Sequence, residues 1–188
     1  SRQHDISQLP TDVTGLVAAV EYPQYLSWIK QTLPDVTEIV IVQGVSKADQ
    51  SYNTPIETLA ETLAYPIRLT NWESYSLAEI KERAAELPPN TIIFYQLMFE
   101  DAAGVKHRPI DVIRELAEAS SVPVVSKYDQ FIGSGTIGGY MYSLEQIATE
   151  AAYIGLIGSR RRWAITVASA VANPAAGTSS TNRCSRGS

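Results

Sequence analysis

Aromatic and acidic side chains stand just before a glycine-rich turn in the last third of the sequence. Tyr128, Asp129 and Phe131 directly precede a G-x-G-x-x-G pattern that runs from Gly133 to Gly138. A carboxylate between aromatic rings suits a pocket for a small polar organic ligand. The glycine pattern suggests a different chemistry, because in dinucleotide-binding proteins it brings the backbone close to a pyrophosphate. The two interpretations predict different functions.

The position of the glycine pattern argues against a dinucleotide site. Such a site requires the pattern to follow the first strand and to open a helix, whose N-terminus then meets the pyrophosphate. Here the pattern follows the fourth expected strand, 122–126, and leads into residues 139–142, which we expect to form a short strand. We therefore predict a glycine turn that lets the chain cross between strands or lobes, and we expect no cofactor.

Polar and aromatic residues also follow the other expected strands. Ligands of an open parallel sheet bind at the carboxyl ends of its strands, so these residues would lie near Asp129. The mixture of amides and rings favours a pocket for a small polar organic ligand. In the alternative interpretation, the rings only cover the sheet end as core. The set is Gln43, Ser46, Asp49, Tyr52, Asn71, Trp72, Gln96, Met98, Phe99, Tyr128, Asp129 and Phe131.

Residues suited to acid–base catalysis are few. Lys127 and Asp129 are close in sequence, but we expect them to point to opposite faces at the strand end. We interpret Asp129 as a ligand or loop-capping carboxylate, Lys127 as a surface residue and His107 as a solvated side chain. The sequence contains neither a Walker loop, a G-x-S-x-G elbow nor an H-E-x-x-H motif.

Alternating strands and helices must position these residues. Capping boxes at Ser76 and Ser143 and prolines near Pro23, Pro55 and Pro109 mark expected helix starts. The order βαβαβαβ, followed by a short strand and a final helix, predicts an α/β fold. We expect a doubly wound, Rossmann-like parallel sheet. The expected strands are 38–42, 65–69, 91–95 and 122–126, and the helices include 54–64, 110–119 and one from 143 to about 155–158.

Charge and composition restrict the class of protein. The 188 residues carry a net charge of -5, which argues against general nucleic-acid binding. One cysteine and two histidines predict neither a disulfide framework nor a metal site. No signal peptide or membrane-spanning run is recognised. We expect a flexible entry over 1–12, an α/β lobe over 13–158 and a flexible basic tail over 159–188.

Several segments, in order, resemble one known family. They are Val13-Thr-Gly, Leu33-Pro-Asp, Ile39-Val-Ile-Val, Leu87-Pro-Pro-Asn-Thr-Ile-Ile-Phe-Tyr, Ser121-Val-Pro-Val-Val, Tyr128-Asp-Gln-Phe and Gly135-Thr-Ile-Gly-Gly-Tyr. Over about residues 12–158 the chain resembles the ABC-transporter substrate-binding proteins of the type 1 periplasmic-binding fold. It is especially similar to the form that serves as the extracytoplasmic sensor region of bacterial signalling proteins such as histidine kinases.

The resemblance implies a non-enzymatic, two-lobed protein that closes on its ligand outside the cytoplasm, with a permease or a histidine kinase as partner. This sequence matches the second lobe, together with a returning strand and helix. Gly44, Ser46, Asp129 and Phe131 would face the cleft, and Gly135, Gly138 and Gly139 would form a hinge.

Two other hypotheses stay open. One is a small Rossmann-like or flavodoxin-like enzyme that uses Asp129 at the strand ends. The other is a docking module, a homodimer formed through apolar surface that the absent lobe would otherwise cover.

Overall fold

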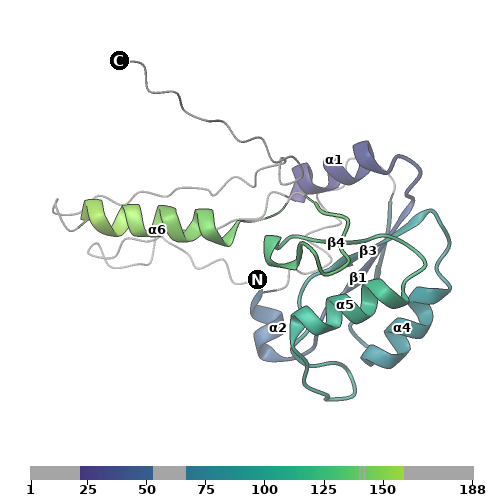
Figure 1. Cartoon of the computed structure of the whole chain (residues 1–188). Helices are drawn as coiled ribbons and strands as arrows, with labels where there is room; N and C mark the ends of the chain where they lie inside the picture. The colour runs from purple at the N-terminus through teal and green to yellow at the C-terminus, as the bar shows by residue number, and fades with distance from the viewer. Residues whose placement is uncertain (1–21, 53–66, 140, 142, 159–188) are drawn as a thin grey trace.

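The computed structural model of the chain describes residues 22–52, 67–139, 141 and 143–158. Its centre is a four-stranded, all-parallel sheet in the order β2-β1-β3-β4 (Figure 1). The strands are β1 (Glu38–Val42), β2 (Arg68–Asn71), β3 (Thr91–Tyr95) and β4 (Val124–Ser126). The chain runs from the central strand β1 out to the edge strand β2, returns to the centre at β3 and ends at the other edge strand, β4. The predicted α/β doubly wound, Rossmann-like sheet is confirmed.

Helices connect the strands. They are α1 (Tyr22–Thr32), α2 (Lys47–Tyr52), α4 (Leu77–Ala85), α5 (Pro109–Ala119) and α6 (Leu144–Gly158), with a 3-10 helix η2 at Asp129–Phe131. The predicted capping box of α4 is present, because the Ser76 side chain accepts from the Glu79 N–H while the Glu79 carboxylate accepts from the Ser76 N–H. Pro109 occupies the first turn of α5, as expected.

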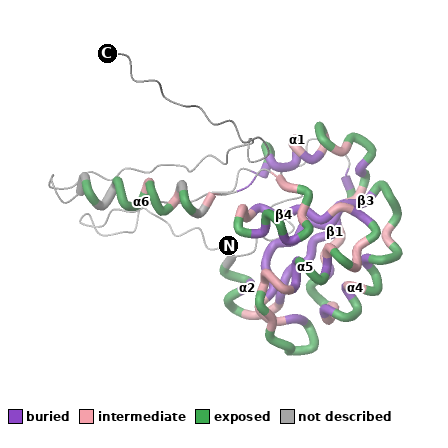
Figure 2. The backbone as a smooth tube through the Cα atoms, viewed as in Figure 1, coloured by how far each residue is buried: buried purple, intermediate pink, exposed green. Residues whose placement is uncertain are grey.

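The sheet is covered on both faces. Strand residues alternate between the faces, so Val40, Ile93 and Val124 join the core against α4 and α5. Their neighbours Ile39, Ile92 and Val125 join a second core against α1. Figure 2 shows this buried centre beneath the exposed outer faces of the helices. Two apolar faces explain why the central strands β1 and β3 are largely apolar.

Several segments differ from the expectation or lie outside the described residues. The second strand is Arg68–Asn71 instead of 65–69, because Arg68 is the residue that pairs with Glu38 of β1. The short helix α2 was not predicted and begins directly after Ser46. No strand forms at 137–139 or at Met141, while residues 140 and 142 lie outside the described residues. The expected helix over 54–64 and the segments 1–12 and 159–188 also lie outside them.

The last described helix stands apart from the sheet. Figure 1 shows α6 projecting to one side of the α/β unit. Its Tyr153 and Leu156 are 64% and 57% exposed. Within the described ranges, none of the helices combines the length and apolar character needed to cross a membrane.

Candidate functional site

A row of hydrogen-bonded side chains crosses the carboxyl ends of all four strands. Gln43 follows β1, Glu73 lies just beyond β2, Gln96 follows β3 and Lys127 follows β4. The Gln43 Nε2 donates to Glu73 Oε2 at 2.7 Å, and the Gln96 Nε2 donates to Gln43 Oε1 at 2.9 Å. The Lys127 Nζ donates to Gln96 Oε1 at 3.2 Å. We call these four residues the carboxyl-edge row.

Strand register places three members of the row side by side. Val42 pairs with Tyr95, and Tyr95 pairs with Ser126, so the next residue of each strand occupies an equivalent position. The bond from the Gln96 N–H to the Val42 carbonyl continues the ladder one step further. Since side chains alternate along a strand, Gln43, Gln96 and Lys127 follow Ile41, Phe94 and Val125 onto the face covered by α1.

The row runs from the surface into the interior. Glu73 is exposed, whereas Gln43, Gln96 and Lys127 are 8%, 0% and 1% exposed. Buried polar groups cost free energy unless they are hydrogen-bonded, and the members of the row provide such bonds to one another. This edge of the sheet is therefore polar inside the protein.

The interpretation of Lys127 as a surface residue is wrong. Its Nζ also donates to the Tyr22 hydroxyl of α1 at 3.4 Å and lies 5.3 Å from the centre of the Tyr128 ring. Burial disfavours the charged ammonium and lowers the pKa of Lys127 to about 7. Residues two apart in a strand share a face, so the alternation already places Lys127 on the face of the buried Val125. It also gives no basis for expecting Lys127 and Asp129 on opposite faces.

Asp49 joins the loops that follow β1 and β3. Its buried carboxylate accepts from the Ser46 hydroxyl at 2.7 Å, the Ser46 N–H at 3.0 Å and the Phe99 N–H at 2.8 Å. A Cβ on Gly44 would lie 2.3 Å from Asp49 Oδ2. Gly44 and Ser46 therefore have a structural role around this carboxylate, while the cleft-facing role expected for them stays a prediction.

The predicted aromatic residues lie in the core or pack against it. Phe131 is 1% exposed, and its ring meets Tyr95 edge-on at 5.6 Å and Tyr128 at 6.0 Å between centroids. Phe131 is thus a core residue, in line with the alternative interpretation of these rings. Phe99 and Tyr128 are half-buried and pack against the same core.

Tyr95, at the end of β3, supports the loop that follows it. Its hydroxyl donates to the Pro109 carbonyl at 3.0 Å and accepts from the Met98 N–H at 3.2 Å. Burial raises the pKa of the Tyr95 hydroxyl. The phenol therefore stays protonated and fixes the loop after β3 to the start of α5.

Two other predicted site residues lie at element ends. Asp129 is half-buried at the start of η2, and its backbone carbonyl accepts from the Ile132 N–H at 3.0 Å. Tyr52 is the last residue of α2, and its side chain lies outside the described structure.

His107 is not the solvated side chain that was expected. Its Nε2 lies 3.1 Å from Asp101 Oδ2, and the two side chains are 17% and 3% exposed. Burial raises the pKa of the Asp101 carboxyl, but donation from the Leu77 N–H and from His107 outweighs it, so the pKa lies below its usual value. Asp101 therefore connects the turn after β3 to the N-terminus of α4. In the described part of the chain, no cluster of three or more His, Cys, Asp or Glu side chains could hold a metal.

The glycine segment is closely packed in places. A Cβ on Gly135 would lie 2.5 Å from the Cβ of Ala117 in α5, and one on Gly139 would lie 2.9 Å from the Ser126 carbonyl oxygen. Gly138 has a φ of +108° and open space around it. No helix begins directly after these glycines, since the next one, α6, starts at Leu144. This geometry does not match a pyrophosphate-binding loop.

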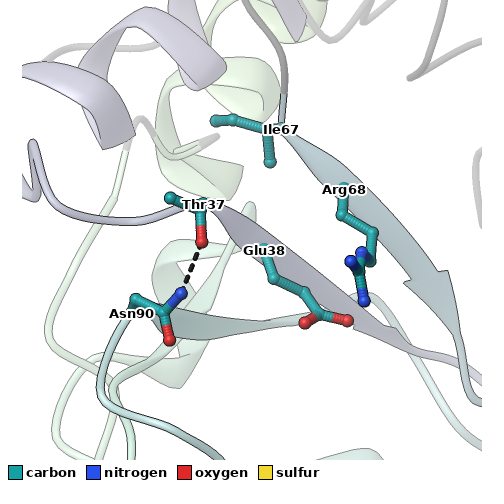
Figure 3. Close-up of a pocket in the computed structure, with 5 residues that line it drawn as sticks. All are labelled: Thr37, Glu38, Ile67, Arg68 and Asn90. Atoms are coloured by element: carbon teal, nitrogen blue, oxygen red, sulfur yellow. Dashed lines mark hydrogen bonds between the residues drawn. The ribbon is translucent and has the colours of Figure 1, made fainter.

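A hollow of about 480 Å³ lies at the opposite, amino end of the strands. Figure 3 shows its lining, with the Asn90 Nδ2 donating to the Thr37 hydroxyl at 2.5 Å. Thr37, Arg68 and Asn90 are exposed, Glu38 is half-buried and Ile67 is buried. None of the residues predicted for the site contributes to this lining.

Comparison with known proteins supports the fold. No protein-family model and no curated protein matches this chain. It is similar to the crystal structure of a conserved domain protein from Vibrio cholerae O1 biovar El Tor strain N16961, with a TM-score of 0.56 and 21% identity. The match covers 85% of this chain and 53% of the other, so this chain spans about half the length of that protein. At this identity the likeness shows a shared fold alone.

Proposed function

We propose that this chain is one lobe of a non-enzymatic binding protein for a small polar organic ligand, of the solute-binding or sensor type. The observation that carries this proposal is the carboxyl-edge row, in which Gln43, Glu73, Gln96 and Lys127 come together from four separate strand ends. The carboxyl edge of a parallel sheet is where α/β proteins bind ligands, and amide side chains provide both donors and acceptors.

The mechanism proposed is closure of a second lobe over this edge. A ligand at an open sheet edge is enclosed on one side only, so a second surface is needed to remove it from water. Ligand would then shift the protein from open to closed states, and a permease or a histidine kinase outside the cytoplasm would respond to that shift. The location and these partners rest on the resemblance of the sequence.

The proposal can be tested by NMR on this chain with a panel of amino acids, purines and short sugars. Gln43 and Gln96 have side-chain amide signals and Trp72 has an indole signal, so the carboxyl edge carries its own reporters. We expect one class of compound to shift these signals. The backbone signals of Thr37, Arg68 and Asn90 at the amino-edge hollow serve as the internal control and should stay unchanged.

Two results would reject the proposal. In the first, no compound of the panel shifts the carboxyl-edge signals at millimolar concentration. In the second, the shifts centre on the amino-edge hollow, which would place binding at the opposite end of the sheet.

A further inference from the structure

The two edge strands of the sheet differ in how far they are covered. On the outer side of β4, the Ile137 N–H donates to the Val124 carbonyl at 3.1 Å, so the glycine segment covers part of this strand. β3 and β4 are buried along their whole length. β2, at the opposite edge, is exposed at Arg68 and half-buried over its other residues. β2 is therefore the most accessible strand of the sheet.

The direction of the hydrogen bonds in β2 leaves two of its residues facing outward. The Arg68 N–H donates to the Thr37 carbonyl at 2.9 Å, and the Trp72 N–H donates to a carbonyl of β1 at 2.9 Å. Backbone groups alternate between the two sides of a strand, so those of Leu69 and Asn71 point away from β1. Among the described residues, none bonds to the backbone N–H or carbonyl of Leu69 or Asn71. We call these backbone groups the open side of β2.

Unpaired backbone groups on an edge strand are a template for a further strand. The charges of β2 favour a second copy of this chain as its source. Exposed Arg68 begins β2, and exposed Glu73 lies just beyond its end. A two-fold axis through the open side makes the two β2 strands antiparallel, which brings Arg68 of each copy toward the end that leads to Glu73 of the other. A parallel arrangement would place Arg68 against Arg68.

We propose that two copies of this chain associate through the open side of β2, as an antiparallel pair that makes the two four-stranded sheets continuous. Leu69 of one copy pairs with Asn71 of the other, and each such pair exchanges both of its N–H···O bonds. This register places Thr70 opposite Thr70 at the two-fold axis, and Thr–Thr pairs stabilise antiparallel strands. The pairing goes beyond the proposed function, and neither requires the other.

The first test measures association and backbone protection on the unchanged chain. Sedimentation equilibrium from micromolar to millimolar concentration should show monomers and dimers in equilibrium. In the monomer, the Leu69 and Asn71 amides face solvent, so hydrogen exchange should be fast, and dimer formation should slow it by about tenfold or more. The Thr70 N–H faces β1 and is the internal control, which should be protected at both concentrations.

A variant then tests the register. Thr70→Lys places two like charges opposite each other at the two-fold axis, and the dissociation constant of the dimer should rise by about tenfold or more. The variant should fold, because lysine is common on edge strands and Glu38, whose Oε1 accepts from the Thr70 hydroxyl at 2.6 Å, lies beside it. Thr149→Lys is the matched control, because Thr149 is an exposed threonine of α6, and its dissociation constant should equal that of the unchanged chain.

Three results would overturn the inference. The unchanged chain could remain monomeric at millimolar concentration. The Leu69 and Asn71 amides could exchange as fast in the dimer as in the monomer, which would place the contact away from β2. Thr149→Lys could weaken association as strongly as Thr70→Lys, which would place the contact on α6. If Thr70→Lys does not fold, the exchange measurement on the unchanged chain decides by itself. The proposed function is judged separately, by the carboxyl-edge signals.

Discussion

The two edges of the same sheet differ in the burial and hydrogen bonding of their polar groups. At the carboxyl edge, Gln43, Gln96 and Lys127 are buried and linked in a row across the strands. At the amino edge, Thr37 and Asn90 are exposed, and their side chains share one hydrogen bond beside an open hollow of about 480 Å³. This hollow therefore lies at the edge where the polar side chains are exposed.

This difference shows why volume alone does not identify a site. Exposed polar groups at the amino edge can hydrogen-bond to water, so their exposure costs little free energy. Burial of amides and an ammonium costs free energy, and the cost is tolerated only where bonds to neighbours or ligands offset it. The carboxyl edge is thus the part of the sheet where single substitutions should have large consequences.

The largest expected effect is that of Gly44→Ala at the carboxyl edge. The added Cβ would lie 2.3 Å from Asp49 Oδ2 in α2 and 2.7 Å from the Glu100 carbonyl oxygen in the loop after β3. We expect the free energy of unfolding to fall by about 3 kcal/mol, measured by urea denaturation. Gly133→Ala is the control, because Gly133 has a φ of +85° but open space, and should cost about 1 kcal/mol. Equal losses would show that Gly44 is not fixed by Asp49.

Most of the sheet could be predicted from sequence, because its strands are buried on both faces. The runs Ile39–Val42 and Ile92–Tyr95 are apolar without alternation, which is typical of central parallel strands. The edge strand β2 was predicted too early in the chain, at 65–69, since its residues Arg68–Asn71 are mostly polar and carry no such signal. Register with β1 fixes its position, and register cannot be read from one strand alone.

The candidate site was predictable in part. Gln96 was expected at the carboxyl edge because it follows a strong strand. Lys127 was missed, since its partner Tyr22 lies 105 residues earlier in the chain and a charged side chain is most often exposed. Asp49 was placed at the strand ends, but its bonds to Phe99 and Glu100 depend on how two loops meet in space. Contacts between separate loops arise from packing that no local pattern reports.

The second prediction concerns pH and the buried end of the row. The pKa of Lys127 falls from 10.5 to about 7 on folding, so between those values the unfolded chain binds a proton that the folded chain does not. Stability should therefore rise with pH over this range. Between pH 7 and pH 9, the free energy of unfolding of the unchanged chain should rise by about 2 to 3 kcal/mol more than that of Lys127→Met, measured by urea denaturation.

The comparison with Lys127→Met removes the contributions of all other titrating groups. At pH 7 the variant should be at least as stable as the unchanged chain, because it buries no charge. A matched substitution at the amino edge, Arg68→Met, should leave the pH dependence unchanged, since Arg68 is exposed. A flat difference between pH 7 and pH 9 would mean that Lys127 keeps its ordinary pKa and is not desolvated.

The smallest of the three effects is expected from Asp101→Asn. The Asp101 carboxylate accepts from the Leu77 and Val105 N–H groups at 3.0 Å and from His107, so its loss should cost about 2 kcal/mol at pH 7. Because folding lowers the pKa of Asp101, its stabilisation is present above the unfolded pKa of about 4 and disappears as pH falls through the folded value. Thermal unfolding of both chains from pH 7 to pH 2 should show the difference in stability shrinking at low pH.

At the amino edge, Asn90→Ala removes an exposed side-chain hydrogen bond and should cost about 0.5 kcal/mol. A cost for Asn90→Ala equal to that for Asp101→Asn would remove the distinction between the two edges.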